Sequence, residues 1–159
     1  MEKIEIGKSP FSKLHHIGAI VSDVDKTAEY YESLGIGPFD PLVLSPKERI
    51  LRGKPADDLK LKIRMAHVGP VRFELIQPVV GKGSIWKEFL DSRGEGISHL
   101  AFLVDDLDKE EAELVKKGLN VIFRVRFQNG GGTTYLETDK VGGVVFELFQ
   151  RPLDYVPHD

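Results

Sequence analysis

Two histidines and two glutamates occupy matching positions in two copies of one sequence pattern. His16 lies in the segment LHHIGAIVSDVDK, and His99 holds the same place 83 positions later in ISHLAFLVDDLDK. Glu74 in VGPVRFELIQP and Glu147 in VGGVVFELFQ also match, 73 positions apart. Imidazole and carboxylate together suit a divalent ion such as Zn, Ni, Co, Mn or Fe(II). Two of each, with water in the remaining positions, would make a catalytic rather than a structural metal site.

The alternation of side chains along each strand strengthens this interpretation. Glu74 stands between Phe73 and Leu75, and Glu147 has the same apolar neighbours. A carboxylate in an apolar strand is costly to bury unless it is paired or bound to a cation. A single strand histidine is more often a hydrogen-bonded core residue, and a single glutamate can point to solvent. The duplication favours a joint site, and it selects His16 over His15, whose counterpart is Ser98.

Each copy begins with a predicted strand followed by a helix. In the first copy the strand is 14–21 and the helix is about 24–34, with Ser22 or Asp23 as cap and Gly35 as its end. In the second copy the strand is 97–104, and the helix starts after Asp105 or Asp106 and ends at Gly118. The repeated Gln77 and Gln150 are assigned a structural role.

Two predicted hairpins complete the copies, one from 59–67 and 71–77 and one from 133–138 and 144–149. Residues 37–55, rich in proline, are predicted to be a long loop. The expected fold is therefore α+β with two modules in tandem, each a strand and a helix followed by shorter strands, at about 13–79 and 96–151, joined by a helix at about 83–94. Each module is small, so we expect both to share one core in a single domain over 1–159.

Composition excludes several classes of protein. The chain has 159 residues, 41% hydrophobic and 30% charged, as expected of a soluble globular protein. It has no apolar run near the roughly 20 residues that cross a membrane, and its start does not resemble a signal peptide. The absence of cysteine excludes disulfides and thiolate ligands and favours a cytoplasmic location. A net charge of -3 without a basic block argues against nucleic acid as a partner.

The four residues, one near the start and one near the end of each copy, resemble the metal ligands of the vicinal oxygen chelate superfamily. This group is also called the glyoxalase, bleomycin resistance protein and dioxygenase superfamily. The resemblance covers residues 13–151. It implies two βαβββ modules in tandem with sheets curved around a shared metal-binding cup, one divalent metal ion per site and a homodimer. The segments GEGISHLAF (94–102) and FELIQP (73–78) look most like methylmalonyl-CoA epimerase-like members, and lactoylglutathione lyase-like members are next in similarity.

Two segments depart from the epimerase pattern. The usual Glu-Gln-Gly before the third strand is Asp58-Leu59-Lys60 here, and the usual Phe-Leu-His-Pro is replaced by residues 135–139 (YLETD). Asp58 could take the family's second-base role, or it could be a solvated loop acid. The extra residues Pro38–Pro55 would reshape the mouth of the cup. These differences put a coenzyme A ester in question as the substrate.

The resemblance implies an isomerase or epimerase that moves a proton next to a carbonyl through a metal-stabilised enolate. Glu147 is the first candidate for the catalytic base, with Glu74 opposite. The substrate would be a small molecule with adjacent oxygens, such as an acyl-CoA or a 2-oxo compound. Four arginines on predicted strands could hold an anionic group or lie at solvated edges: Arg64, Arg72, Arg124 and Arg126.

Three other functions fit the same fold. A lactoylglutathione lyase (glyoxalase I) would share the four ligands and the enediolate chemistry. An extradiol dioxygenase would use two histidines and one carboxylate around iron, which the symmetric set of four argues against. A non-catalytic small-ligand-binding protein would bind in an apolar cup without metal, and four retained ligands argue against that too.

Overall fold

The computed structural model describes residues 2–81 and 84–155, and these form two compact units. The first-repeat unit contains His15–Val43 and Ala56–Leu100, and the second-repeat unit contains Met1–Leu14, Leu44–Pro55 and Ala101–Asp159. Within the described residues, three helices and ten strands give the α+β fold that the sequence predicts. The helices are α1 (Val24–Ser33), α2 (Ile85–Arg93) and α3 (Leu107–Lys116).

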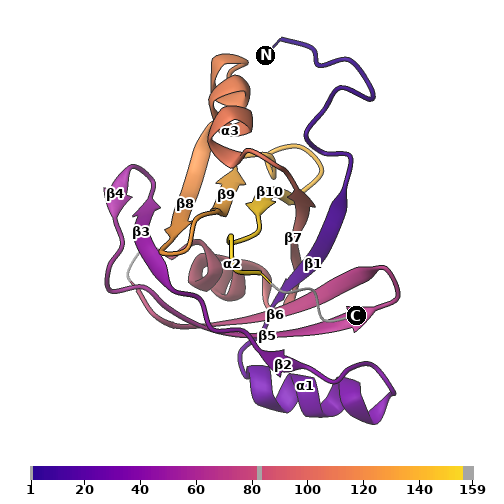
Figure 1. Ribbon diagram of the computed structural model, residues 1–159. Helices are drawn as coiled ribbons and strands as arrows, with labels where there is room; N and C mark the ends of the chain where they lie inside the picture. The colour runs from indigo at the N-terminus through magenta and orange to yellow at the C-terminus, as the bar shows by residue number, and fades with distance from the viewer. Residues whose placement is uncertain (1, 82–83, 156–159) are drawn as a thin grey trace. The chain divides into compact units, whose positions relative to one another are not determined.

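The first-repeat unit has the strand order β2-β5-β6-β1-β7. Strand β1 (Leu14–Ile20) runs parallel to β6 (Val71–Val80), and β6 forms the predicted hairpin with β5 (Lys60–Val68). Strand β2 (Asp40–Pro41) pairs with the outer side of β5. Helix α1 packs against β5 and β6 (Figure 1) and buries an apolar cluster against them. The members of this cluster are Ala19, Val21, Val24, Ala28, Phe39, Ala66 and Leu75.

The second-repeat unit continues from β7 (Gly96–Leu103) in the order β7-β10-β9-β8-β3-β4. Strands β8 (Val121–Phe127), β9 (Gly132–Leu136) and β10 (Val145–Gln150) are antiparallel neighbours, and α3 packs on β9 and β10. The β9–β10 hairpin confirms the prediction for this part of the chain.

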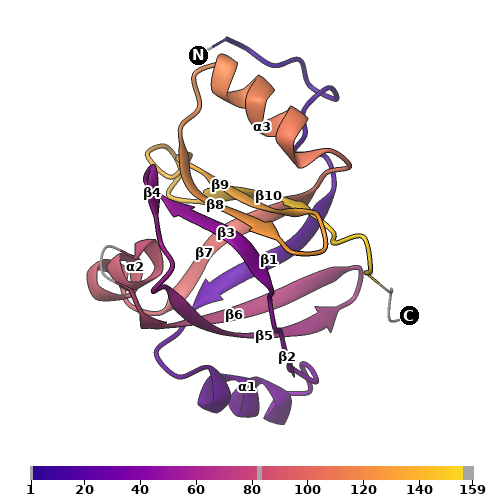
Figure 2. The same ribbon diagram turned by 60° about the vertical axis from the view of Figure 1, so that its left-hand side comes forward.

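The predicted loop 37–55 is wrong, because it contains β2 and two strands that extend the second-repeat unit. Strands β3 (Pro46–Leu51) and β4 (Lys54–Pro55) form a hairpin, and β3 pairs antiparallel with β8. Figure 2 shows β3 beside β8. The inserted residues therefore satisfy the backbone groups of β8, which would otherwise be an open sheet edge. The repeat could not reveal this pairing, since the second copy has no segment that matches these extra residues.

Both module helices begin with the same pair of hydrogen bonds. The Asp23 side chain accepts from the Lys26 amide, and the Gln77 side-chain oxygen accepts from the Val24 amide. The second copy repeats them: Asp106 accepts from Lys109 N, and Gln150 Oε1 accepts from Leu107 N. Side-chain acceptors satisfy first-turn amides that have no partner within the helix. The predicted aspartate caps and the structural role of both glutamines are confirmed.

The linking helix is α2, capped by Ser84, whose hydroxyl accepts from the Lys87 amide. Residue 83, where the sequence predicts its start, lies outside the described residues. Within residues 2–81 and 84–155, no helix is long and apolar enough to cross a membrane.

Packing of α3 gives a test of the fold with a built-in control. Leu114 is 2% exposed, whereas its neighbour Val115 is 49% exposed. We expect Leu114→Ala to lower the free energy of unfolding by roughly 2–5 kcal/mol, because it removes buried methyl groups and leaves a cavity. Val115→Ala should change it by less than about 0.5 kcal/mol. Urea titrations followed by circular dichroism measure both, and equal effects would contradict the position of α3.

Candidate metal centre

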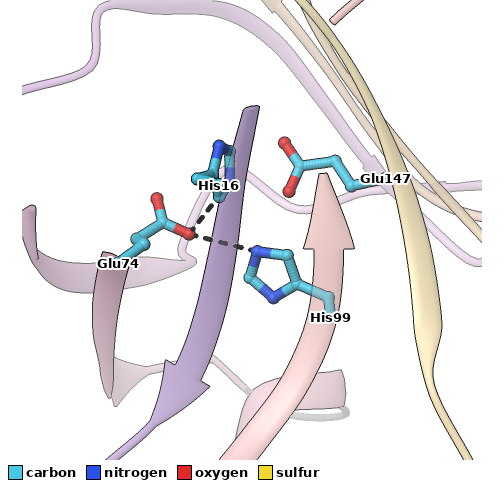
Figure 3. Close-up of side chains that lie close together, drawn as sticks. All are labelled: His16, Glu74, His99 and Glu147. Atoms are coloured by element: carbon cyan, nitrogen blue, oxygen red, sulfur yellow. Dashed lines mark ion pairs between the residues drawn. The ribbon is translucent and has the colours of Figure 1, made fainter. Parts of the chain in front are cut away.

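Three of the four predicted ligands meet inside the first-repeat unit. His16 lies on β1, Glu74 on β6 and His99 on β7, and all three side chains are buried. The His16 Nε2 and His99 Nε2 atoms lie 3.4 Å and 3.2 Å from the same Glu74 oxygen, Oε2 (Figure 3). Two nitrogens and a carboxylate oxygen, each from a different strand, therefore converge at one point.

The charge state of Glu74 reflects its two imidazole neighbours. Burial alone would raise the pKa of the carboxyl group. The charge of His16 and the hydrogen bonds from both histidines outweigh burial and lower the pKa of Glu74 from 4.5 to about 2. The carboxyl group is thus held as the anion in a buried position, and an anionic oxygen beside imidazole nitrogens is a donor set that fits a divalent cation.

This lowered pKa predicts how stability depends on pH. Because the pKa of Glu74 is depressed in the folded chain, its contribution to stability is fully present above about pH 4.5 and is lost as the pH falls toward 2. We expect the difference in unfolding free energy between metal-free wild type and Glu74→Gln to shrink across this window. Denaturant titrations at several pH values measure it. A difference that stays constant from pH 5 to about 2 would contradict the pairing.

The ring of His99 is fixed on the side away from Glu74. Ser98 Oγ lies 3.1 Å from His99 Nδ1 and also donates a hydrogen bond to the Gly18 carbonyl oxygen at 3.4 Å. The ring lies directly over Gly18: a Cβ atom added there would be 1.8 Å from His99 Cε1 and 2.2 Å from Nε2. Only glycine leaves room for the imidazole at this position of β1.

The ring of His16 is held in a similar way by the residue before it. His15 Nδ1 lies 2.8 Å from His16 Nδ1, and the guanidinium of Arg72 lies 3.1 Å from His15 Nε2. Strand alternation places adjacent side chains on opposite faces, so the sequence did not connect His15 or Ser98 with the site. Their shared position, directly before each histidine in the repeat, was the available signal.

Glu147 lies on β10 of the second-repeat unit. It is 3% exposed, and the hydroxyl of Thr133 on β9 donates a hydrogen bond to its Oε1 atom. Its backbone pairs with that of Tyr135. The predicted burial of this carboxylate within an apolar strand is thus confirmed, and Thr133 is a polar neighbour that the sequence did not single out.

Asp58 and the strand arginines differ from the ligand residues. Asp58 is exposed in the turn before β5, so its second-base role stays a prediction.

Three arginines form ion pairs with helix acids instead of lying at solvated edges. Arg64 pairs with Asp25 of α1, while Arg124 and Arg126 both pair with acids of α3. These arginines link each module helix to its sheet.

Comparison with known proteins agrees with the fold. The family described as the glyoxalase/bleomycin resistance protein/dioxygenase superfamily matches residues 15–136. The chain belongs to this superfamily. It is 26% identical over 140 residues to the uncharacterized protein YqjC of Bacillus subtilis (strain 168). The aligned region covers 86% of this chain and 91% of that protein.

Solved structures give the same fold. The methylmalonyl-CoA epimerase from Mycobacterium tuberculosis superposes with a TM-score of 0.69 at 25% identity, covering 92% of each chain. A methylmalonyl-CoA epimerase in complex with methylmalonyl-CoA and NH4+ has a TM-score of 0.66 at 23% identity, covering 92% of this chain and 99% of that one. Methylmalonyl-CoA epimerases are therefore structural neighbours of this protein.

Proposed function

We propose that this protein is a divalent-metal-dependent epimerase or isomerase that moves a proton on the carbon next to a carbonyl group. The observation that carries the proposal is the convergence of His16 Nε2 and His99 Nε2 on one buried oxygen of Glu74. Superfamily membership supports it, and so does the similarity to methylmalonyl-CoA epimerases.

The proposed ligands are His16, Glu74, His99 and Glu147. Glu147 is included because it is the counterpart of Glu74 in the repeat and is a buried carboxylate on an apolar strand. When bound, the ion would act as a Lewis acid for negative charge developing on the substrate oxygens.

The protein residues would then supply the proton transfer. Glu147 is the first candidate to remove the α-proton, and Glu74 is the candidate for the opposite face of the carbon, since inversion requires two acid/base groups. The Thr133 hydroxyl donates a hydrogen bond to Glu147 Oε1 and so fixes the position of this carboxylate. Asp58 remains an alternative for the second group.

The solved structures of the epimerases support a candidate substrate class. One neighbouring epimerase is described as a complex with methylmalonyl-CoA, so a small acyl-CoA with an acidic α-hydrogen is the first candidate. The departures around Asp58 and at residues 135–139 favour testing other acyl-CoA esters and 2-oxo acids beside it.

Two measurements test the proposal. Elemental analysis of the purified protein, followed by titration with Zn²⁺, Co²⁺, Ni²⁺ and Mn²⁺, should give one bound ion per chain. Incubation of the loaded protein with candidate acyl-CoA esters and 2-oxo acids in deuterated water should give α-proton exchange by NMR. Absence of metal binding would overturn the proposal; metal binding with oxygen uptake on catechols and no exchange would replace it with a dioxygenase.

A further inference from the structure

We propose that Ser98 is a positioning residue that, together with the space left by Gly18, sets the orientation of the His99 imidazole. The proposal rests on the metal-binding role of His99 proposed above. It concerns a residue that has no counterpart of its own type in the repeat, because His15 occupies that place in the first copy.

The Ser98 hydroxyl holds the ring of His99 on the side away from Glu74. It donates to the Gly18 carbonyl, which can only accept, at 3.4 Å, and its oxygen lies 3.1 Å from His99 Nδ1. With Nδ1 in contact with Ser98, the ring directs Nε2 toward Glu74 Oε2, 3.2 Å away. A hydrogen-bond partner behind a ligand histidine fixes the orientation of the ring at the metal.

The glycine is needed for space, not for its backbone. Gly18 lies within β1, and the position matched to it in the second copy holds Ala101, which is fully buried on β7. A methyl group is thus accommodated at the matched position of β7. At Gly18 the same methyl group would overlap three ring atoms of His99 at 1.8–2.3 Å, so the ring would have to leave its place.

The experiment uses the full chain in the metal-free form and during titration with Zn²⁺. We expect Ser98→Ala to weaken Zn²⁺ affinity about 10–100-fold, as loss of a hydrogen-bond partner behind a ligand histidine does elsewhere. Ser98→Thr, which keeps the hydroxyl, should restore most of it. Ser92→Ala is the matched control, because that hydroxyl is exposed on α2 and bonds the Glu88 carbonyl. A chelator competition assay measures all four proteins.

A second readout does not depend on metal. Nuclear Overhauser spectra of the metal-free protein should show contact between His99 Hε1 and the Gly18 Hα protons in wild type, because a Cβ atom at Gly18 would lie 1.8 Å from His99 Cε1. Ser98→Ala should weaken this contact, and Gly18→Ala should displace the ring, with circular dichroism reporting whether each variant folds. Equal Zn²⁺ affinity of Ser98→Ala and wild type, or an unchanged contact in Ser98→Ala, would overturn the inference. Wild type that binds no Zn²⁺ but shows a contact that Ser98→Ala loses would overturn the proposed function alone.

Discussion

Replacing His99 by alanine should abolish metal binding. His99 is 1% exposed, and its Nε2 lies 3.2 Å from Glu74 Oε2, so its removal takes one nitrogen out of the proposed donor set. Loss of a group behind a ligand costs about 10–100-fold in affinity, and loss of the ligand itself should cost at least about 100-fold. Chelator competition with Zn²⁺ on both proteins measures the ratio.

The matched control is His67→Ala, because His67 is an exposed histidine on β5. It should leave Zn²⁺ affinity unchanged. If His99→Ala binds one ion as tightly as wild type, the assignment of His99 as a ligand is wrong. Circular dichroism of the metal-free variants separates a loss of binding caused by the missing ligand from a failure to fold.

The second large effect is expected on proton transfer. Glu147→Gln should slow α-proton exchange by about 10²–10⁴-fold, because the amide keeps a ligand oxygen but cannot take up a proton. Exchange in deuterated water is followed by NMR and divided by the bound metal, so that a weaker affinity is not counted as a loss of chemistry.

Glu113→Gln serves as the control for this experiment, since Glu113 is exposed on α3 and pairs with Lys116. It should exchange protons at the wild-type rate. Should Glu147→Gln keep that rate with metal bound, Glu147 is not the base, and Glu74→Gln and Asp58→Asn become the deciding variants.

Features that repeat in the sequence could be predicted, because each copy checks the other. The caps Asp23 and Asp106 are examples, and so are the hairpins and the buried phase of Glu74 and His99. The homodimer and the shared core of a single domain were predicted from resemblance and size, and they remain predictions.

Features that occur once could not be predicted in this way. The pairing of β3 with β8 joins residues far apart in the sequence, such as Glu48 and Arg126, which are 78 positions apart. Nothing in the repeat specifies this pairing. The contact of Ser98 with His99 depends on local ring placement over Gly18. Alternation along an ideal strand argues against that contact.

The most direct test of the account is a crystal of the protein loaded with Zn²⁺ and measured at the zinc absorption edge. The account predicts one anomalous peak per chain, with nitrogen ligands from His16 and His99 and oxygen ligands from Glu74 and Glu147 at about 2.0–2.2 Å. A peak bound by other residues, or a fully loaded ion that lacks any of these four, would contradict it.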